Sequence, residues 1–214
     1  MLLSHLHWDH VHGLPFFSGG ARPGHEVDVR LPAIDDDALG TLARGLSPPH
    51  FPISPEQLGD GWSFSALEPG LLHAAGFDVL VREIPHKGGR TFGFRVSDGE
   101  HAIAYLADHS PLGVGPGPDG LGEYHDAALQ LAAGADVLVH DAQFVAAEFP
   151  RVAYLGHSAV EYAIGLATAA KSQSLLLFHH APDRTDDELD LIAKSVCTAL
   201  LPVSAAIEGV EIHL

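Results

Sequence analysis

Short apolar runs alternate with helical patterns along the chain, and glycine and proline separate them. Apolar runs rich in β-branched and aromatic residues are typical of strands, and they occur at 79–84, 91–96, 102–106, 137–139, 174–178 and 210–214. Apolar residues spaced three and four apart predict helices, here at 35–46, 124–133, 158–170 and 185–200. Strands interleaved with helices favour a layered α/β architecture.

Local signals define the ends of two helices. Ser158 with Glu161, and Thr185 with Glu188, each form the pattern of a capping box. Two stretches rich in glycine and proline, 47–61 and 113–122, are predicted as surface loops rather than linkers. A chain of 214 residues therefore suits a single domain, 1–214.

Polar residues follow the predicted strands at their carboxyl ends. They are His86, Asp108, His140–Asp141 and His179–His180. Loops at strand ends are where layered α/β folds usually build a ligand site. The pattern thus predicts one site assembled from several distant parts of the chain.

The charge balance narrows the class of ligand. Lys and Arg number 11 against 28 Asp and Glu, which gives a net charge of −17. Because nucleic-acid affinity depends on cationic side chains that neutralise phosphates, a large nucleic-acid footprint is not expected. A small phosphorylated substrate remains compatible, since bound metal ions can supply local positive charge.

Cysteine usage and the absence of targeting signals point to a cytoplasmic protein. The single cysteine, Cys197, excludes an intramolecular disulfide and is expected to be buried. The chain opens with no signal-peptide pattern and holds no apolar run of about 18 residues, so no membrane partner is predicted.

Histidine is abundant, and its densest cluster lies near the start. The segment Ser4-His5-Leu6-His7-Trp8-Asp9-His10 places four potential metal ligands within six residues. Imidazole and carboxylate groups are both ligands of zinc. A solvated, His-rich loop is the competing interpretation, but the His-x-His-x-Asp-His spacing favours metal binding.

This run resembles the hallmark of the metallo-β-lactamase-fold hydrolase superfamily. The resemblance is strongest to its branch with ribonuclease Z and the phosphoribosyl cyclic phosphodiesterases. Supporting motifs follow in order: Leu14-Pro15-Phe16-Phe17, Pro85-His86, Thr91-Phe92-Gly93-Phe94-Arg95, Tyr105-Leu106-Ala107-Asp108, His140-Asp141-Ala142-Gln143-Phe144, Gly156-His157-Ser158 and Leu177-Phe178-His179-His180. The resemblance implies a four-layer αββα sandwich.

The same resemblance implies a ligand set for two divalent ions, zinc in the first instance, with manganese or iron able to replace it. The first ion would be bound by His5, His7 and His86, the second by Asp9, His10 and His179, and Asp108 would bridge both. The apolar pattern before His179 and His180 does not decide which of the two faces the metals, and the resemblance favours His179.

The resemblance also implies a proton-donating pair, Asp141 and His157. Asp9, together with the ions, is expected to position the attacking group. A carboxylate orients an imidazole and stabilises its protonated form, which can then protonate a leaving oxygen. In the competing interpretation, His157 merely precedes a helix cap at Ser158. Supporting or surface roles are expected of His12, His50, His109 and His140.

One departure from the superfamily concerns the amino terminus. Members carry several strands ahead of the histidine run, whereas here the run begins four residues after Met1. An N-terminally truncated domain would expose apolar surface and an unpaired strand edge. Lower stability or association into a homodimer is therefore expected.

These expectations lead to one function and two alternatives. The first is a dinuclear zinc phosphodiesterase that hydrolyses a small phosphodiester by metal-hydroxide attack. The loop 113–122 has no Lys or Arg, so we do not expect it to bind transfer RNA. The alternatives are hydrolysis of another ester, thioester or lactone on the same scaffold, and an inactive metal-binding remnant. A β-lactam substrate is the least favoured.

Overall fold

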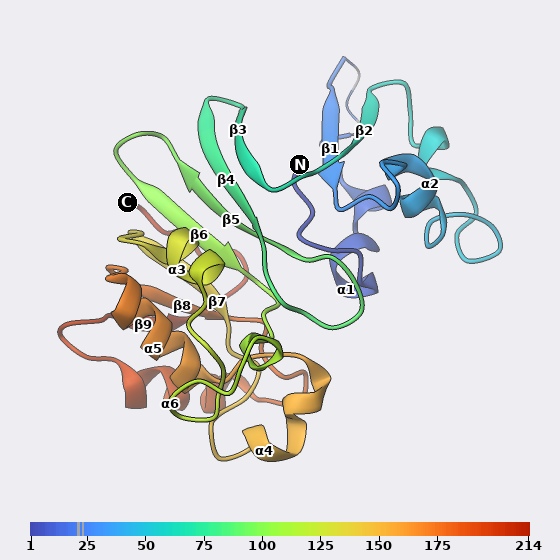
Figure 1. Ribbon diagram of the computed structural model, residues 1–214. Helices are drawn as coiled ribbons and strands as arrows, with labels where there is room; N and C mark the ends of the chain where they lie inside the picture. Colours follow the sequence, from blue (N-terminus) through green and yellow to red (C-terminus); the bar gives the residue numbers. More distant parts are fainter. Residues whose placement is uncertain (21, 23) are drawn as a thin grey trace. The chain divides into compact units, whose positions relative to one another are not determined.

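A computed structural model describes every residue of the chain except 21 and 23 (Figure 1). The chain divides into two compact units, Met1–Glu68 and Pro69–Leu214. Each unit has its own sheet and its own hydrophobic core.

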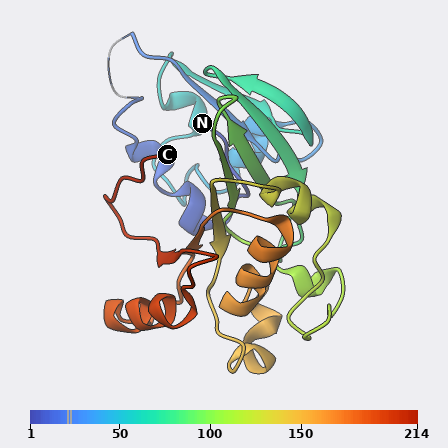
Figure 2. The ribbon, with the colours of Figure 1, turned by 90° about the vertical axis from the view of Figure 1, so that its left-hand side faces the viewer.

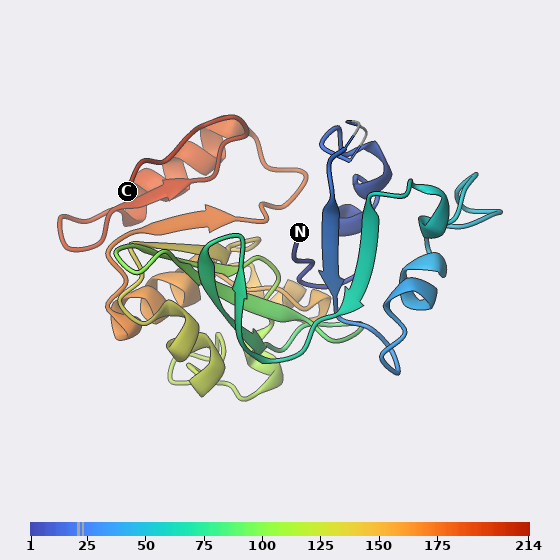
Figure 3. The ribbon, with the colours of Figure 1, turned by 90° about the horizontal axis from the view of Figure 1, so that it is seen from above.

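The first unit is built around two parallel strands, β1 (Val27–Leu31) and β2 (Trp62–Ala66), which lie side by side in Figure 3. Its helical segments are α1 (Trp8–Val11), η1 (Leu14–Phe16), α2 (Ala38–Ala43) and η2 (Pro55–Gln57). Val29 and Leu31 of β1 are fully buried, and Leu42 of α2 belongs to the same core. The segment before α1 is tied to β1, because the Leu3 N–H donates to the Arg30 carbonyl oxygen at 2.9 Å.

The second unit contains a seven-stranded mixed sheet with strands in sequence order. They are β3 (Gly70–Ala74), β4 (Phe77–Glu83), β5 (Phe92–Ser97), β6 (Ala102–Leu106), β7 (Val137–Asp141), β8 (Leu175–Phe178) and β9 (Val203–Ala205). Pairing is antiparallel from β3 to β6 and parallel from β6 to β9. The helical segments are η3 (Pro111–Gly113), α3 (Asp126–Ala132), α4 (Phe149–Val152), η4 (Ala153–Leu155), α5 (Val160–Ala170) and α6 (Asp186–Val196).

Strand direction determines which loops meet. Since β4 and β6 are both antiparallel to β5, they run in the same direction, and β7 and β8 run parallel to β6. The carboxyl ends of β4, β6, β7 and β8 therefore lie at one edge of the sheet. The segments that follow these four ends carry the polar residues singled out in the sequence.

Helices α3 and α5 cover one face of this sheet and form its main core (Figure 2). Leu131 of α3 and Leu166 of α5 are fully buried against Leu106 and Leu138 of the strands. Burial of side chains of this size stabilises the fold by about 1.5–3 kcal/mol each, relative to exposure. A well-packed core of this kind holds the strand ends at fixed positions.

The predicted elements are mostly confirmed, with shorter helices. The strands at β4 to β8 and the helices α2, α3, α5 and α6 lie within or beside the expected ranges. The strand expected at 210–214 is wrong, because those residues have no regular structure. The strands β1, β2, β3 and β9 were not expected from the pattern.

Of three local expectations, one is confirmed and two are wrong. Thr185 caps α6 and exchanges hydrogen bonds with Glu188, as the capping box predicts. The box at Ser158 is wrong: Ala159 is the N-cap of α5, and the Ser158 hydroxyl donates instead to the His109 carbonyl oxygen. Cys197 is exposed, because α6 ends at Val196 and leaves it on the surface.

Within the part of the chain that the structure describes, no helix is long and apolar enough to cross a membrane.

Candidate metal centre

The histidine run of the first unit forms a tight group of rings around α1. His5 is buried, and its ring lies 4.5 Å from the ring of His7 and 4.2 Å from that of His10, between centroids. The Ser4 hydroxyl lies 3.0 Å from Nδ1 of His5 and fixes the orientation of this ring. Asp9 is more exposed, with its Oδ2 3.4 Å from Nε2 of His10. The structure thus brings these four predicted ligands into one small region of the first unit.

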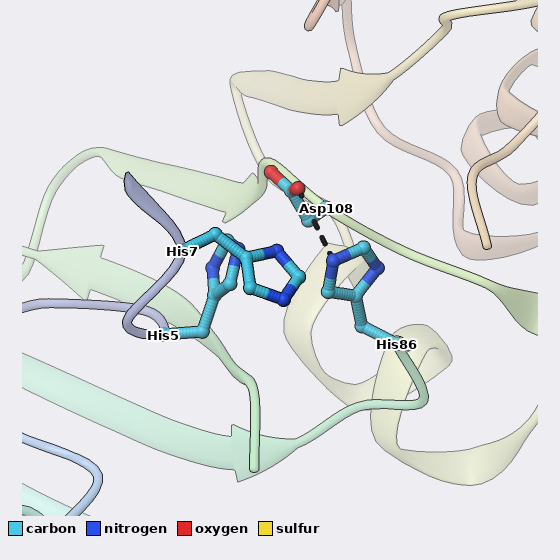
Figure 4. A group of neighbouring side chains, drawn as sticks. All are labelled: His5, His7, His86 and Asp108. Carbon is cyan, nitrogen blue, oxygen red and sulfur yellow. Dashed lines mark ion pairs between the residues drawn. The ribbon is translucent and has the colours of Figure 1, made fainter. Parts of the chain in front are cut away.

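In the second unit, a buried carboxylate lies at the end of β6. The side chains of Asp108 and His86 are each only 1% exposed, and Oδ2 of Asp108 lies 3.4 Å from Nε2 of His86 (Figure 4). Nδ1 of His86 is 2.8 Å from the Gly156 carbonyl oxygen, which can only accept, so Nδ1 carries the proton. The lone pair of Nε2 is then directed toward the carboxylate side, as in most metal-binding histidines.

Gly156 is required for this arrangement. Its φ is +92°, and a Cβ at this position would lie 2.7 Å from Cβ of Lys87. A residue with a side chain would displace the carbonyl that orients His86.

His179 follows β8 and contacts the same carboxylate oxygen. Its Nε2 lies 2.9 Å from Oδ2 of Asp108. The backbone of His179 has φ = +53°, an uncommon conformation for a residue other than glycine. Strained backbone of this kind is concentrated at functional sites. The neighbouring His180 is half-buried and forms a hydrogen bond with the backbone of Ala206.

Asp141 and His157 form a close pair at the end of β7. Nδ1 of His157 donates to Oδ2 of Asp141 at 2.9 Å. The fully buried carboxylate also accepts from the backbone N–H groups of His109, at 3.0 Å, and Gln143, at 3.1 Å. Three donors compensate the loss of hydration of a buried negative charge.

The two arrangements of the second unit are contiguous. The ring of His157 lies 4.7 Å from that of His179 and 5.1 Å from that of His86. Asp108, His157 and His179 each offer a ligand atom, and these atoms lie within 4.8 Å of one another. The imidazole of His157, which is expected to donate a proton, therefore lies directly beside Asp108 and His179.

Burial modifies the titration of groups around the cluster. Burial, and then the negative charge of Asp108, raise the pKa of Tyr105 to about 12, so its phenol stays protonated. Burial lowers the pKa of His140, which is fully buried on β7. His109, expected in a supporting or surface role, is also fully buried. The sequence did not signal this burial.

The sheet and the cluster at its edge define the class: a metallo-β-lactamase fold, whose sites hold divalent metal ions. The chain belongs to the beta-lactamase superfamily domain family, whose model matches residues 1–180. It is similar to ribonuclease Z of Listeria monocytogenes, serotype 4a (strain HCC23), with 29% identity over 220 residues. That match covers 84% of this chain and 69% of the relative.

Two solved structures show the same fold. The metallo-β-lactamase-fold protein YhfI of Bacillus subtilis matches with a TM-score of 0.69 and 23% identity, over 98% of this chain and 75% of that one. A diphosphatase from the PhnP family matches with a TM-score of 0.66 and 17% identity, over 100% of this chain and 70% of that one. The expected superfamily, its ribonuclease Z-like branch and the α/β fold class are confirmed.

Proposed function

We propose that this protein is a phosphodiesterase that uses two divalent metal ions, zinc in the first instance, to hydrolyse a small phosphodiester. The observation that carries the proposal is the hydrogen bond between Nδ1 of His157 and Oδ2 of Asp141, 2.9 Å long, beside the Asp108 and His179 contact. A carboxylate-oriented imidazole next to a set of metal-ligand side chains suits the protonation of a leaving oxygen.

The donor set of the second unit fits a divalent cation. One buried carboxylate oxygen of Asp108 has imidazole nitrogens at 2.9 Å and 3.4 Å, from His179 and His86. Mixed imidazole and carboxylate donors suit zinc and also manganese and iron. When bound, a pair of such ions would lower the pKa of a water molecule and stabilise negative charge on the phosphoryl oxygens.

We assign the histidine run of the first unit to the same centre. His5, His7, Asp9 and His10 would supply further ligands, and Asp9 would also help to orient the attacking group. The order of the motifs and the family match over residues 1–180 support this assignment.

The residues of the chain have separate tasks in the reaction. His157, protonated at Nε2, donates that proton to the leaving oxygen of the phosphodiester. Asp141 holds the ring through Nδ1 and stabilises its cationic form. The buried backbone donors of Asp141 keep this carboxylate in one orientation, so the pair needs little reorganisation during the reaction.

The net charge of −17 supports a small substrate rather than an RNA. Cyclic nucleotides and cyclic sugar phosphates are the preferred candidates, because they carry far fewer negative charges than an RNA and so need fewer cationic side chains for binding. Because the chain is similar to ribonuclease Z proteins, an RNA should be included in the substrate panel for comparison.

The experiment combines metal analysis with a substrate panel. The purified chain is expected to hold about two equivalents of zinc and to cleave bis-nitrophenyl phosphate and a cyclic phosphodiester faster than a precursor RNA, a thioester or a lactone. His7→Ala should lose metal and activity together. His73→Ala, an exposed histidine paired with Asp78, is the control and should retain both.

Three outcomes would reject the proposal. Absence of tightly held metal would favour a non-catalytic remnant. Turnover of the acyl substrates alone would favour the thioester or lactone alternative. Equal cleavage by the His7→Ala variant and the unmodified chain would remove the histidine run from the site.

A further inference from the structure

Three histidines of the second unit form a continuous hydrogen-bonded chain behind the candidate site. His140 lies on β7, His109 follows β6, and His125 is the residue before α3. Nε2 of His140 lies 2.9 Å from Nδ1 of His109, and Nε2 of His109 lies 2.8 Å from Nε2 of His125. His140 and His109 are fully buried, whereas His125 is only partly buried.

The hydrogen bond at the inner end of the histidine chain, at His140, determines which ring nitrogen of each histidine carries a proton. Nδ1 of His140 lies 2.7 Å from the carbonyl oxygen of Asp141, which can only accept, so this nitrogen carries a proton. In a neutral ring, Nε2 of His140 then accepts, and Nδ1 of His109 must donate to it. Nε2 of His109 accepts in turn, and Nε2 of His125 donates. Burial lowers the pKa of both His140 and His125, which favours these neutral rings.

The chain does not suit proton transfer to the site. A proton passed inward from His125 would have to end on the amide carbonyl oxygen of Asp141, which is a very weak base. A row of neutral rings with one tautomer each is instead a rigid connection between three elements of the fold.

The backbone of His109, the residue that carries the middle ring, is hydrogen-bonded to the Asp141–His157 pair and its neighbour. The backbone N–H of His109 donates to Oδ2 of Asp141 at 3.0 Å, and its carbonyl oxygen accepts from the Ser158 hydroxyl at 2.6 Å. Ser158 is the residue after His157. The backbone of His109 is therefore hydrogen-bonded on one side to the carboxylate of the pair and on the other to the chain segment that carries its imidazole.

We propose that His125, His109 and His140 are positioning residues that fix the orientation of the Asp141–His157 pair. This inference rests on the proposed phosphodiesterase function, in which that pair protonates the leaving group. The rings of His109 and His140 each pack edgewise or tilted against Tyr162, at 5.6 Å and 5.7 Å between centroids, so neither can rotate without disturbing α5. His125 is the accessible end of the histidine chain, and its hydrogen bond to His109 holds the two inner rings from that side.

The test replaces His125, because this partly buried outer residue can be changed without leaving a large cavity. His125→Leu removes the donor and leaves Nε2 of His109 without one. His125→Gln retains an N–H donor at a similar reach. His101→Leu, at another partly exposed histidine in the same unit, is the matched control.

The first measurement compares two phosphodiesters, one with an alkyl leaving group and one with a p-nitrophenyl leaving group, which needs little protonation. We expect His125→Leu to lower kcat for the alkyl substrate by about tenfold, a partial loss of general-acid catalysis. The aryl substrate should change less than about twofold, KM should be unchanged, and His125→Gln should restore the ratio. An equal fall for both substrates, or no change in either, would overturn the positioning role.

The second measurement does not depend on activity. Ring ¹⁵N spectra at pH 7.5 should show His140 and His109 each protonated at Nδ1 alone. The Nδ1 proton of His157 should give a protected signal in the unmodified chain and in His125→Gln, and a broadened one in His125→Leu. The opposite tautomer at His140, or an unaltered His157 signal in His125→Leu, would refute the proposal. Refutation here with phosphodiester turnover intact would leave the proposed function standing.

Discussion

Two histidine–aspartate pairs in the second unit have the same contact distance and very different surroundings. In both, Nδ1 of the histidine lies 2.9 Å from a carboxylate oxygen: His157 with Asp141, and His73 with Asp78. The side chains of the first pair are 13% and 0% exposed, and those of the second 70% and 64%.

The difference shows that contact distance alone does not identify a functional pair. The exposed pair links adjacent residues of the β3–β4 hairpin, where water and salt screen the charges and the pair contributes little. The buried pair is held by two further backbone donors and lies beside Asp108 and His179. A fixed, water-poor environment is what permits an imidazole to donate a proton in one direction.

The largest expected effect comes from the carboxylate next to the buried pair. Asp108→Asn removes the negative charge that Nε2 of His86 and His179 share. We expect loss of at least one metal equivalent and a fall in kcat/KM on the order of 10³-fold. Asp78→Asn should change neither quantity. Metal content by atomic absorption and steady-state kinetics test both, and a metal-replete, active Asp108→Asn variant would contradict the assignment.

A smaller loss is expected when the buried imidazole itself is changed. His157→Gln should lower kcat for an alkyl phosphodiester by about 10²-fold, because the general acid is lost. A p-nitrophenyl substrate should be affected much less, and zinc content should be retained. His73→Gln is the matched variant in the exposed pair and should match the unmodified chain. Loss of zinc from His157→Gln would instead make His157 a metal ligand.

Burial also predicts a pH dependence of stability. The folded-state pKa of His140 lies below its ordinary value, so the unfolded chain gains this proton first as the pH falls below about 6.5. The contribution of neutral His140 to the free energy of unfolding is fully present above that pH. It declines below that pH by at most about 1.4 kcal/mol per pH unit. His125 shifts in the same direction.

Urea unfolding between pH 8 and pH 5.5, at a fixed metal concentration, measures this slope. The His140→Gln variant should show a shallower decline than the unmodified chain. Parallel slopes in the two proteins would show that His140 is already protonated in the folded state.

The smallest effect is expected for the exposed pair. His73→Ala with Asp78→Ala should shift the melting temperature by no more than about 1 °C, and added salt should reduce even this difference. A shift of several degrees would mean that the hairpin pair is not screened, and the contrast between the two pairs would then be one of degree.

Much of the second unit's candidate site was predictable because its residues lie at the ends of apolar strands. His86, Asp108 and His179 follow strands, Asp141 is the last residue of β7, and the common direction of β4, β6, β7 and β8 brings these ends to one edge. The contact between His179 and Asp108 was not predictable from the pattern. It depends on the positive φ of His179, which directs its ring to Asp108.

The histidine chain was not predictable from residue type. His109 and His140 had the same polar character as surface histidines such as His50, and their burial follows from packing against Tyr162 on a distant helix. Ser158 had an ideal capping pattern, yet its hydroxyl is used by His109. A capping pattern read from neighbouring residues cannot reveal that His109, 49 residues away, accepts the hydrogen bond of the Ser158 hydroxyl.

The common direction of the four strands places the opposite rim of the sheet away from the candidate site. The turns there are tight, with Gly76 and Gly99 at positive φ between β3 and β4 and between β5 and β6. Strands of five to seven residues separate this rim from the candidate site by about 17–24 Å. A fluorophore, affinity handle or surface anchor attached at residues 98–100 would therefore report on or immobilise the protein at a distance from the candidate site of the second unit.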